Sequence, residues 1–266
     1  MHHTNSTALT DWALRKPGAQ LHLMQRYTTS YWSVLARAGT AVSIHEELTD
    51  EALGAAIAAR NARGAGHVLV APLVSRHFDF LHELFASSTL PLPAPILTPA
   101  LSGTVLLLGS APVGPTTVER LQRYAGRLPV VRFGSTETCL QVMGTPLILS
   151  EAARLTAFQA GWAHEYRGQP QPGYYIGRPH PPFTECRVVK SVDASSSDFL
   201  VDCELGEPGQ LITRGDNVMS GYVGAPEATK KALVDGGWYT NLGDMVFRLP
   251  NAEDGAEDFY WLSRDS

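Results

Sequence analysis

Four small or polar residues follow an apolar run in the middle of the chain: Gly134, Ser135, Thr136 and Glu137 come directly after "VVRF". The hydroxyl of Thr136 can donate a hydrogen bond to a phosphate oxygen. The carboxylate of Glu137 is a hard oxygen ligand, and magnesium usually binds one or two carboxylates together with substrate phosphates. A strand that ends in a polar turn would carry similar residues, so this pattern alone is weak evidence for a phosphate and metal site.

A second strand end carries small residues, because Gly109, Ser110 and Ala111 follow the apolar run "TVLLL". Small side chains would let a flat ring approach the backbone, and Phe133 could cover the other face of that ring. Ligands of open parallel sheets lie beyond the carboxyl ends of the strands. Since both segments follow strands of one βαβ unit, we expect them to lie at adjacent strand ends and to face one cleft.

The elements that would position these residues alternate between strand and helix in the first half of the chain. Apolar runs predict strands over residues 41–45, 67–73, 104–112 and 128–137, and helical periodicity predicts helices over residues 11–41, 49–64, 76–88 and 116–127. This alternation is typical of a parallel sheet covered by helices on both faces.

The character of the sequence changes after "QPQPGYYIGRP", where short alternating runs such as "ECRVVKSV", "GQLITRG" and "DFYWLSR" are separated by turn residues. The predicted fold class is therefore α/β. A Rossmann-like parallel sheet flanked by helices is followed by a small antiparallel, β-barrel-like subdomain. The predicted domains are residues 1–165, which carry the GSTE segment, and residues 166–266.

Composition excludes several classes of protein. The 266 residues carry a net charge of −5 and no basic run, which argues against a nucleic-acid partner. The apolar runs are too short to span a bilayer, and the polar start predicts no secretory signal, so we expect a cytoplasmic location. Three widely spaced cysteines predict neither a disulfide framework nor a zinc site. Cys139 is a weak candidate for a nucleophile, because it has no histidine neighbour in the sequence.

The second half of the chain holds a long characteristic run, "GEPGQLITRGDNVMSGYVGAPEATKKALVDGGWYTNLGDMVF". Together with GSTE it resembles the adenylate-forming superfamily: acyl-CoA synthetases, adenylation domains of peptide synthetases, and luciferases. The matching segments occur in the family's order: Phe133–Glu137, Gly173–Pro179, Gly206–Leu211, Arg214–Tyr222, Gly237–Asp244 and Ser263–Arg264. The resemblance covers about two thirds of the chain and matches a central portion of the family's sequence.

The resemblance implies a role for each matched residue. Gly109, Ser110 and Ala111 would line one face of the adenine of ATP or AMP, and Phe133 would replace the usual tyrosine on the other. Thr136 would contact the phosphates, Glu137 would bind Mg²⁺, and Asp244 would accept hydrogen bonds from both ribose hydroxyls, with Arg264 nearby. Other residues complete the implied site: Gly134 and Ser135 for the cofactor, and Thr138, Cys139, Leu140, Met143 and Gly144 for the acyl pocket.

The sequence also departs from the family pattern. The usual "TGD" is "NLGD" here, the usual "GR" is "SR", and Met24–Tyr27 stand where many members have a histidine near the acyl pocket. Residues 1–130 contain no run rich in Ser, Thr and Gly that ends in a lysine, which the family uses to grip triphosphate. The chain also ends at the family's hinge, before the domain that carries the catalytic lysine. We therefore expect the chain to be inactive alone and to need the missing parts of the same enzyme or a partner chain.

Two functions remain open on the sequence. The first is the central part of an AMP-forming ligase that activates a small carboxylic acid as an acyl-adenylate, using ATP and Mg²⁺, and passes it to coenzyme A or a carrier-protein thiol. The second is a non-catalytic module that binds a nucleotide or an acyl group. An unrelated hydrolase is a weaker alternative, because the chain has no G-x-S-x-G elbow.

Overall fold

The computed structural model describes residues 20–23, 42–44, 67–89, 94–139 and 141–264. The described chain divides between Val131 and Arg132 into two compact units, here called the N-terminal and the C-terminal unit. The predicted domain boundary between residues 165 and 166 stays a prediction.

A parallel sheet forms the N-terminal unit. Its strands run in the order β2-β1-β3-β4-β5, and every pair is parallel. Their bounds are β1 (Gln20–Leu23), β2 (Val42–Ile44), β3 (His67–Leu73), β4 (Thr104–Leu108) and β5 (Val130–Phe133). Leu108 pairs with Leu73 on one side and with Val131 on the other. The predicted parallel sheet is therefore confirmed.

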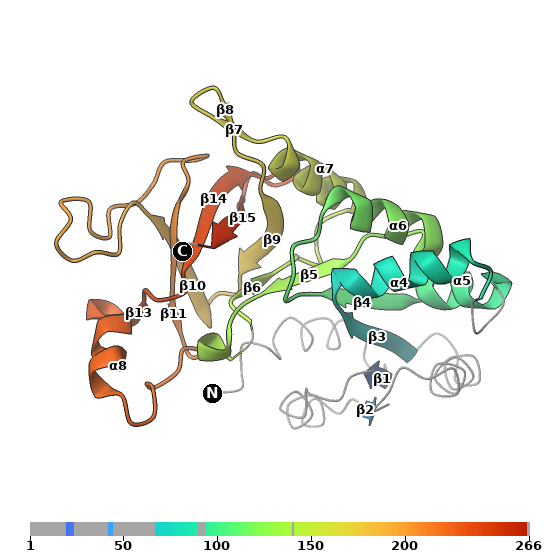
Figure 1. The fold of residues 1–266 in the computed structure, drawn as a ribbon, viewed down its shortest axis with the longest axis horizontal. Helices are drawn as coiled ribbons and strands as arrows, with labels where there is room; N and C mark the ends of the chain where they lie inside the picture. The colour runs from blue at the N-terminus through green and yellow to red at the C-terminus, as the bar shows by residue number, and fades with distance from the viewer. Residues whose placement is uncertain (1–19, 24–41, 45–66, 90–93, 140, 265–266) are drawn as a thin grey trace. The chain divides into compact units, whose positions relative to one another are not determined.

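Three helices pack together on one face of this sheet: α4 (Ser75–Ala86), α5 (Ala94–Ser102) and α6 (Pro115–Ala125) (Figure 1). Strand β4 is an almost continuous apolar run with Leu106 and Leu108 fully buried, as expected for a central strand of a parallel sheet. Helix α6 begins with Pro115 and is followed by Gly126 in the left-handed conformation, with φ of 63°. Proline at the start and glycine after the end favour these helix limits.

One helix predicted for the N-terminal unit differs from the structure, and another is not tested by it. The helix predicted over residues 11–41 is wrong at Gln20–Leu23, which form strand β1, and its other residues lie outside the described part of the chain. The helix predicted over residues 49–64 lies outside it altogether. Helix α5 was not predicted, because Pro99 interrupts its helical pattern.

The C-terminal unit is built on antiparallel strands. From one edge inward they run β12-β13-β11-β14-β15-β9-β6 and then the end of β5, and β10 also pairs with β11. Their bounds are β6 (Met143–Gly144), β9 (Tyr174–Pro179), β10 (Thr184–Val189), β11 (Gly209–Gly215), β12 (Leu233–Val234), β13 (Trp238–Tyr239), β14 (Asp244–Pro250) and β15 (Glu257–Arg264). The predicted antiparallel character is confirmed, but the described strands form an open series rather than a closed barrel.

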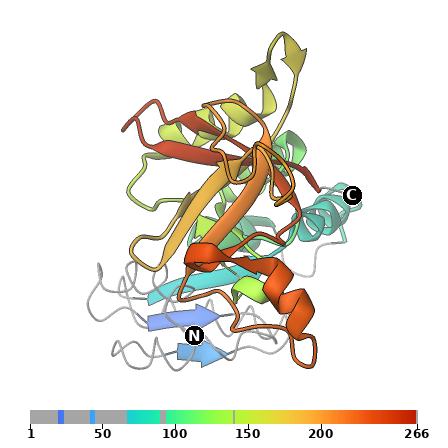
Figure 2. The same ribbon diagram turned by 90° about the vertical axis from the view of Figure 1, so that its left-hand side faces the viewer.

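Short elements complete the C-terminal unit: α7 (Glu151–Trp162), α8 (Pro226–Ala232), the 3₁₀ turns η2 (Thr136–Thr138) and η3 (Asp235–Gly237), and the hairpin strands β7 (Glu165–Tyr166) and β8 (Gln169–Pro170). The red β14–β15 hairpin can be followed in Figure 1 and Figure 2. Its inner residues join the core of the unit, where Val246 and Phe259 pack with Met143, Val188 and Tyr239. None of the described helices is long and apolar enough to cross a membrane.

Candidate functional site

The GSTE segment forms a tight turn that exposes its chemistry. Strand β5 ends at Phe133, and Ser135 precedes the single 3₁₀ turn η2. The fully buried Thr138 closes the turn, because its hydroxyl accepts a hydrogen bond from the Ser135 amide at 2.9 Å and donates one to the Ser135 carbonyl at 3.1 Å. Thr136 is exposed and Glu137 is half-buried. The turn thus carries an exposed hydroxyl and a half-buried carboxylate on consecutive residues.

A second segment of the C-terminal unit holds this turn in place. The Met219 amide donates a hydrogen bond to the Glu137 carbonyl at 2.8 Å. The side-chain amide of Asn217 donates to the carbonyls of Thr138 at 3.1 Å and Gln141 at 3.0 Å, and Asn217 is fully buried. Sequence reasoning placed the "RGDNVMSGY" run in the family but did not find this support for the GSTE turn.

Tyr239 lies within the electrostatic influence of Glu137. The hydroxyls of Tyr222 and Tyr239 are 3.1 Å apart, and Tyr239 donates to the Asn241 carbonyl at 3.0 Å. Burial is the main cause that raises the pKa of Tyr239, and the hydrogen bond with Tyr222 and the negative charge of Glu137 raise it further. Tyr239 therefore stays a neutral hydroxyl.

Asp244 is a buried carboxylate at the start of β14, with 5% of its surface exposed. It lies opposite Arg264 in the β14–β15 register. Its Oδ1 atom accepts hydrogen bonds from the Trp261 indole at 2.8 Å and from Arg264 Nε at 3.3 Å. Within the described residues no hydrogen bond reaches Oδ2. Asp244 is therefore a fixed anion with one oxygen left to accept hydrogen bonds from a ligand.

The third group of predicted residues lies in the N-terminal unit, directly after β4. Gly109 is buried, and its amide donates to the Leu73 carbonyl at 3.3 Å. Ser110 has a left-handed φ of 64°, and both Ser110 and Ala111 are exposed. These residues do follow the carboxyl end of a central strand, as predicted. That they face one cleft with the GSTE turn stays a prediction.

The residues predicted for an acyl pocket have different surroundings. Cys139 is half-buried in the GSTE turn with φ of 50°. Met143 and Gly144 are buried in β6, where Gly144 lies so close to Gly177 that a Cβ on Gly177 would come within 2.1 Å of the Gly144 carbonyl carbon. Leu140 lies outside the described residues. Their role in an acyl pocket stays a prediction.

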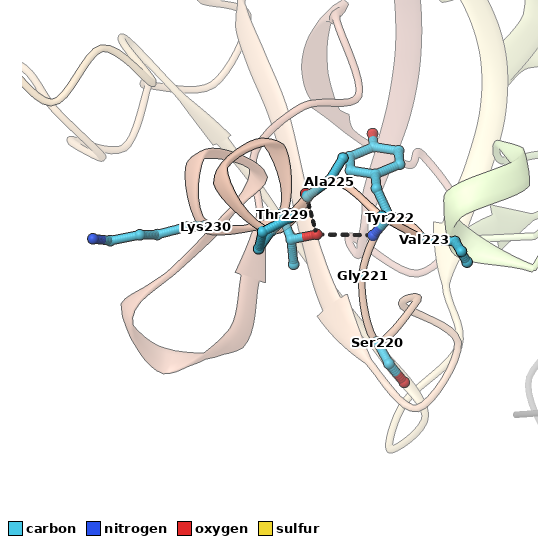
Figure 3. Close-up of a pocket in the computed structure, with 9 residues that line it drawn as sticks. Ser220, Gly221, Tyr222, Val223, Ala225, Thr229 and Lys230 are labelled. Carbon is cyan, nitrogen blue, oxygen red and sulfur yellow. Dashed lines mark hydrogen bonds between the residues drawn. The ribbon is translucent and has the colours of Figure 1, made fainter.

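A surface pocket of about 550 Å³ lies elsewhere in the C-terminal unit, between the end of the "RGDNVMSGY" run and helix α8 (Figure 3). Its lining residues are Ser220, Gly221, Tyr222, Val223, Gly224, Ala225, Pro226, Thr229 and Lys230. The Tyr222 amide donates to the Thr229 hydroxyl at 2.8 Å, which ties the two sides of the pocket together. None of the predicted site residues lines it.

The donor atoms at the GSTE turn suit magnesium held jointly with a nucleotide. The described residues contain no group of three or more His, Cys, Asp or Glu side chains that could hold a metal alone. Glu137 supplies one carboxylate, and no hydrogen bond or ion pair with another described residue occupies it. Magnesium commonly binds through one carboxylate plus phosphate oxygens and water, so this donor set fits the ion.

Comparison with known protein families identifies the family of this chain. A family model described as "AMP-binding enzyme" matches residues 9–223, and the chain therefore belongs to the AMP-binding enzyme family. This match confirms the predicted membership of the adenylate-forming superfamily.

Curated relatives match over shorter stretches. A 2-hydroxy-7-methoxy-5-methyl-1-naphthoate–CoA ligase from Streptomyces carzinostaticus is 38% identical over 78 residues, which are 29% of this chain and 12% of the ligase. The human long-chain-fatty-acid–CoA ligase 6 is 29% identical over 147 residues, which are 55% of this chain and 17% of the ligase.

Solved structures match nearly the whole chain. ATP-bound MatB from Rhodopseudomonas palustris is 19% identical, with a TM-score of 0.64 over 98% of this chain and 43% of that chain. The AMP complex of o-succinylbenzoate coenzyme A synthetase from Bacillus subtilis is also 19% identical, with a TM-score of 0.59 over 98% of this chain and 44% of that chain. At this identity the similarity shows the fold, and the chain spans less than half the length of these proteins.

Proposed function

We propose that this chain forms the adenosine- and magnesium-binding part of an ATP-dependent, AMP-forming ligase, which activates a carboxylic acid as an acyl-adenylate and passes it to coenzyme A or a carrier-protein thiol. The surroundings of Asp244 are the observation that supports the proposal most directly. A buried carboxylate that is held by an indole and a guanidinium, and keeps one oxygen open, suits a pair of ribose hydroxyls. The family match and the names of the relatives, which are CoA ligases, support it.

Each protein group has a separate task in this proposal. Asp244 fixes the ribose, and the ring of Phe133 stacks on the adenine. Thr136 donates a hydrogen bond to a phosphate oxygen, and Glu137 holds Mg²⁺, which neutralises charge on the phosphates when it is bound. The acid carboxylate then attacks the α-phosphorus and releases pyrophosphate.

Calorimetric titration with AMP and with ribose 5-phosphate tests the proposal. AMP should bind weakly but measurably, and ribose 5-phosphate should bind at least about fivefold more weakly, because stacking on an aromatic side chain contributes about 1–3 kcal/mol per base. ATP without magnesium should gain little over AMP. Absence of AMP binding, or equal affinity for the two compounds, would contradict an adenosine site.

A further inference from the structure

We infer that Asn217 is a positioning residue that fixes the magnesium-binding turn, an inference that rests on the role proposed above for Glu137. Asn217 is fully buried, and its amide nitrogen bridges two carbonyls, those of Thr138 and Gln141. These acceptors lie just after Glu137 in the chain. The turn is thus held from a segment about 80 residues further on rather than by neighbours in sequence.

The two acceptors define the orientation of the Asn217 amide. Both partners are carbonyl oxygens, so only the NH₂ group can face them. The Oδ1 atom of Asn217 is buried and accepts no hydrogen bond among the described residues. A buried acceptor without a partner carries a desolvation cost. Asn217 has this cost at Oδ1, while its NH₂ group makes two hydrogen bonds to the turn.

The backbone of the same segment adds a third hydrogen bond, from the Met219 amide to the Glu137 carbonyl at 2.8 Å. Three hydrogen bonds from residues 217–219 therefore reach residues 137, 138 and 141. Glu137 itself has no side-chain partner within the described chain, so its direction depends on its backbone. A carboxylate that must meet a metal ion needs such support, because small displacements at a metal ligand weaken binding strongly.

The inference predicts that substitutions of Asn217 release the turn, whereas substitution of another buried asparagine does not. Asn217→Asp keeps the shape of the side chain but replaces its NH₂ donor with an oxygen acceptor. That oxygen would face two carbonyl oxygens, so the substitution should release the turn. Asn217→Ala removes the donor and should release it as well. Asn251→Ala is the matched control, because Asn251 is also a buried asparagine of the C-terminal unit, but its amide bonds to Asp258 and not to the GSTE turn.

Two measurements on the purified full chain test this. The first is the rate at which iodoacetamide labels Cys139, read by peptide mass spectrometry, because Cys139 lies in the turn and reports its order without any ligand. The second is the ratio of the ATP dissociation constants without and with Mg²⁺. A general loss of nucleotide affinity changes both constants equally and leaves this ratio unchanged.

Both Asn217 variants should label at Cys139 at least tenfold faster than wild type and should lose the magnesium-dependent gain, while Asn251→Ala keeps both wild-type values. Unchanged Cys139 labelling in the Asn217 variants would overturn the inference, and so would equal acceleration in Asn251→Ala. If wild type itself shows no magnesium-dependent gain, the role of Glu137 is wrong, and the labelling rates alone then decide whether Asn217 holds the turn.

Discussion

Glu137 is the residue whose substitution should change the effect of Mg²⁺ on ATP affinity most clearly. Its carboxylate is half-buried and carries no hydrogen bond from another described residue. Glu137→Gln keeps the shape and removes the charge, so it should leave AMP affinity within about twofold and abolish the gain in ATP affinity on adding Mg²⁺. Titration with AMP and with ATP, with and without Mg²⁺, gives both values. A variant that still gains affinity with Mg²⁺ would exclude Glu137 as the metal ligand.

The three thiols should differ in reactivity. Burial raises the pKa of Cys186 to about 12 and that of Cys203 to about 11. Only the thiolate reacts, so at about pH 8 these two thiols are almost entirely protonated and unreactive. Alkylation of the native chain should modify Cys139 first. Labelling of Cys186 and Cys203 should rise only as the pH approaches 11. Rapid labelling of Cys203 at pH 8 would contradict the raised pKa that its burial implies.

At the scale of elements, the sequence could predict those with a strong local pattern. Strands β3, β4 and β5 and helices α4 and α6 were expected within a few residues of their observed limits. Helix α7 was missed although it carries a recognisable start, because Ser150 precedes Glu151 and the Ser150 hydroxyl accepts the Ala153 amide at 3.1 Å. This signal was present in the sequence but was not used.

Other features of the site could not be read from local patterns, because they depend on tertiary register. Asp244 lies opposite Arg264 only because the β14–β15 pairing contains an irregularity between Met245 and Val246. The bond from Trp261 to Asp244 depends on the same register. Likewise, Asn217 reaches the GSTE turn from a distant segment. Motif matching supplied the candidate residues, and the structure supplied the groups that hold them.

Ser150 provides a test at this scale. Ser150→Ala removes the cap of helix α7 and also its side-chain hydrogen bond to Glu253. Loss of an N-cap typically costs about 1 kcal/mol, so the variant should lower the free energy of unfolding by about that amount. Ser220→Ala, at an exposed position, should change it by less than about 0.5 kcal/mol. Urea denaturation measures both. Equal effects of the two substitutions would contradict the capping role.

At the scale of the whole molecule, the C-terminal unit contains an ionic cluster built around one buried carboxylate, that of Asp258. Arg178 of β9 donates to Asp258 at 2.6 Å and to Asp254 at 2.7 Å, and Asp258 is fully buried. Arg178→Met would leave Asp258 buried without its cation, which typically costs about 3–5 kcal/mol. Denaturant unfolding should show this loss, whereas Lys190→Met, which removes an exposed cation 3.9 Å from the half-buried Glu207, should cost less than about 1 kcal/mol.

The same cluster gives a pH dependence with a definite sign. Burial already raises the pKa of Asp258, and the hydrogen bonds from Asn251 and Arg178 oppose that rise. Removing Arg178 raises the pKa further above the unfolded value, so the variant gains stability relative to wild type as the pH falls and Asp258 takes up a proton. The stability gap between Arg178→Met and wild type should therefore narrow as the pH falls from neutral toward the ordinary pKa of an aspartate, about 4. A gap that widens on acidification would contradict the buried-charge explanation.

Ribose recognition by Asp244 is the central claim, and one double-mutant cycle tests it most directly. Calorimetry would compare AMP with 2′-deoxy-AMP on wild type, Asp244→Ala and Asp244→Asn. Asp244→Asn keeps the shape and an oxygen for Trp261, but it places a donor where the open oxygen stood.

Hydrogen bonds to a charged group contribute about 1.5–3 kcal/mol each. AMP should therefore bind wild type at least tenfold more tightly than it binds either variant, and removing the 2′-hydroxyl should weaken binding to wild type while hardly affecting the variants. If AMP binds wild type and Asp244→Ala equally well, or if the 2′-hydroxyl contributes equally in all three proteins, Asp244 does not bind the ribose.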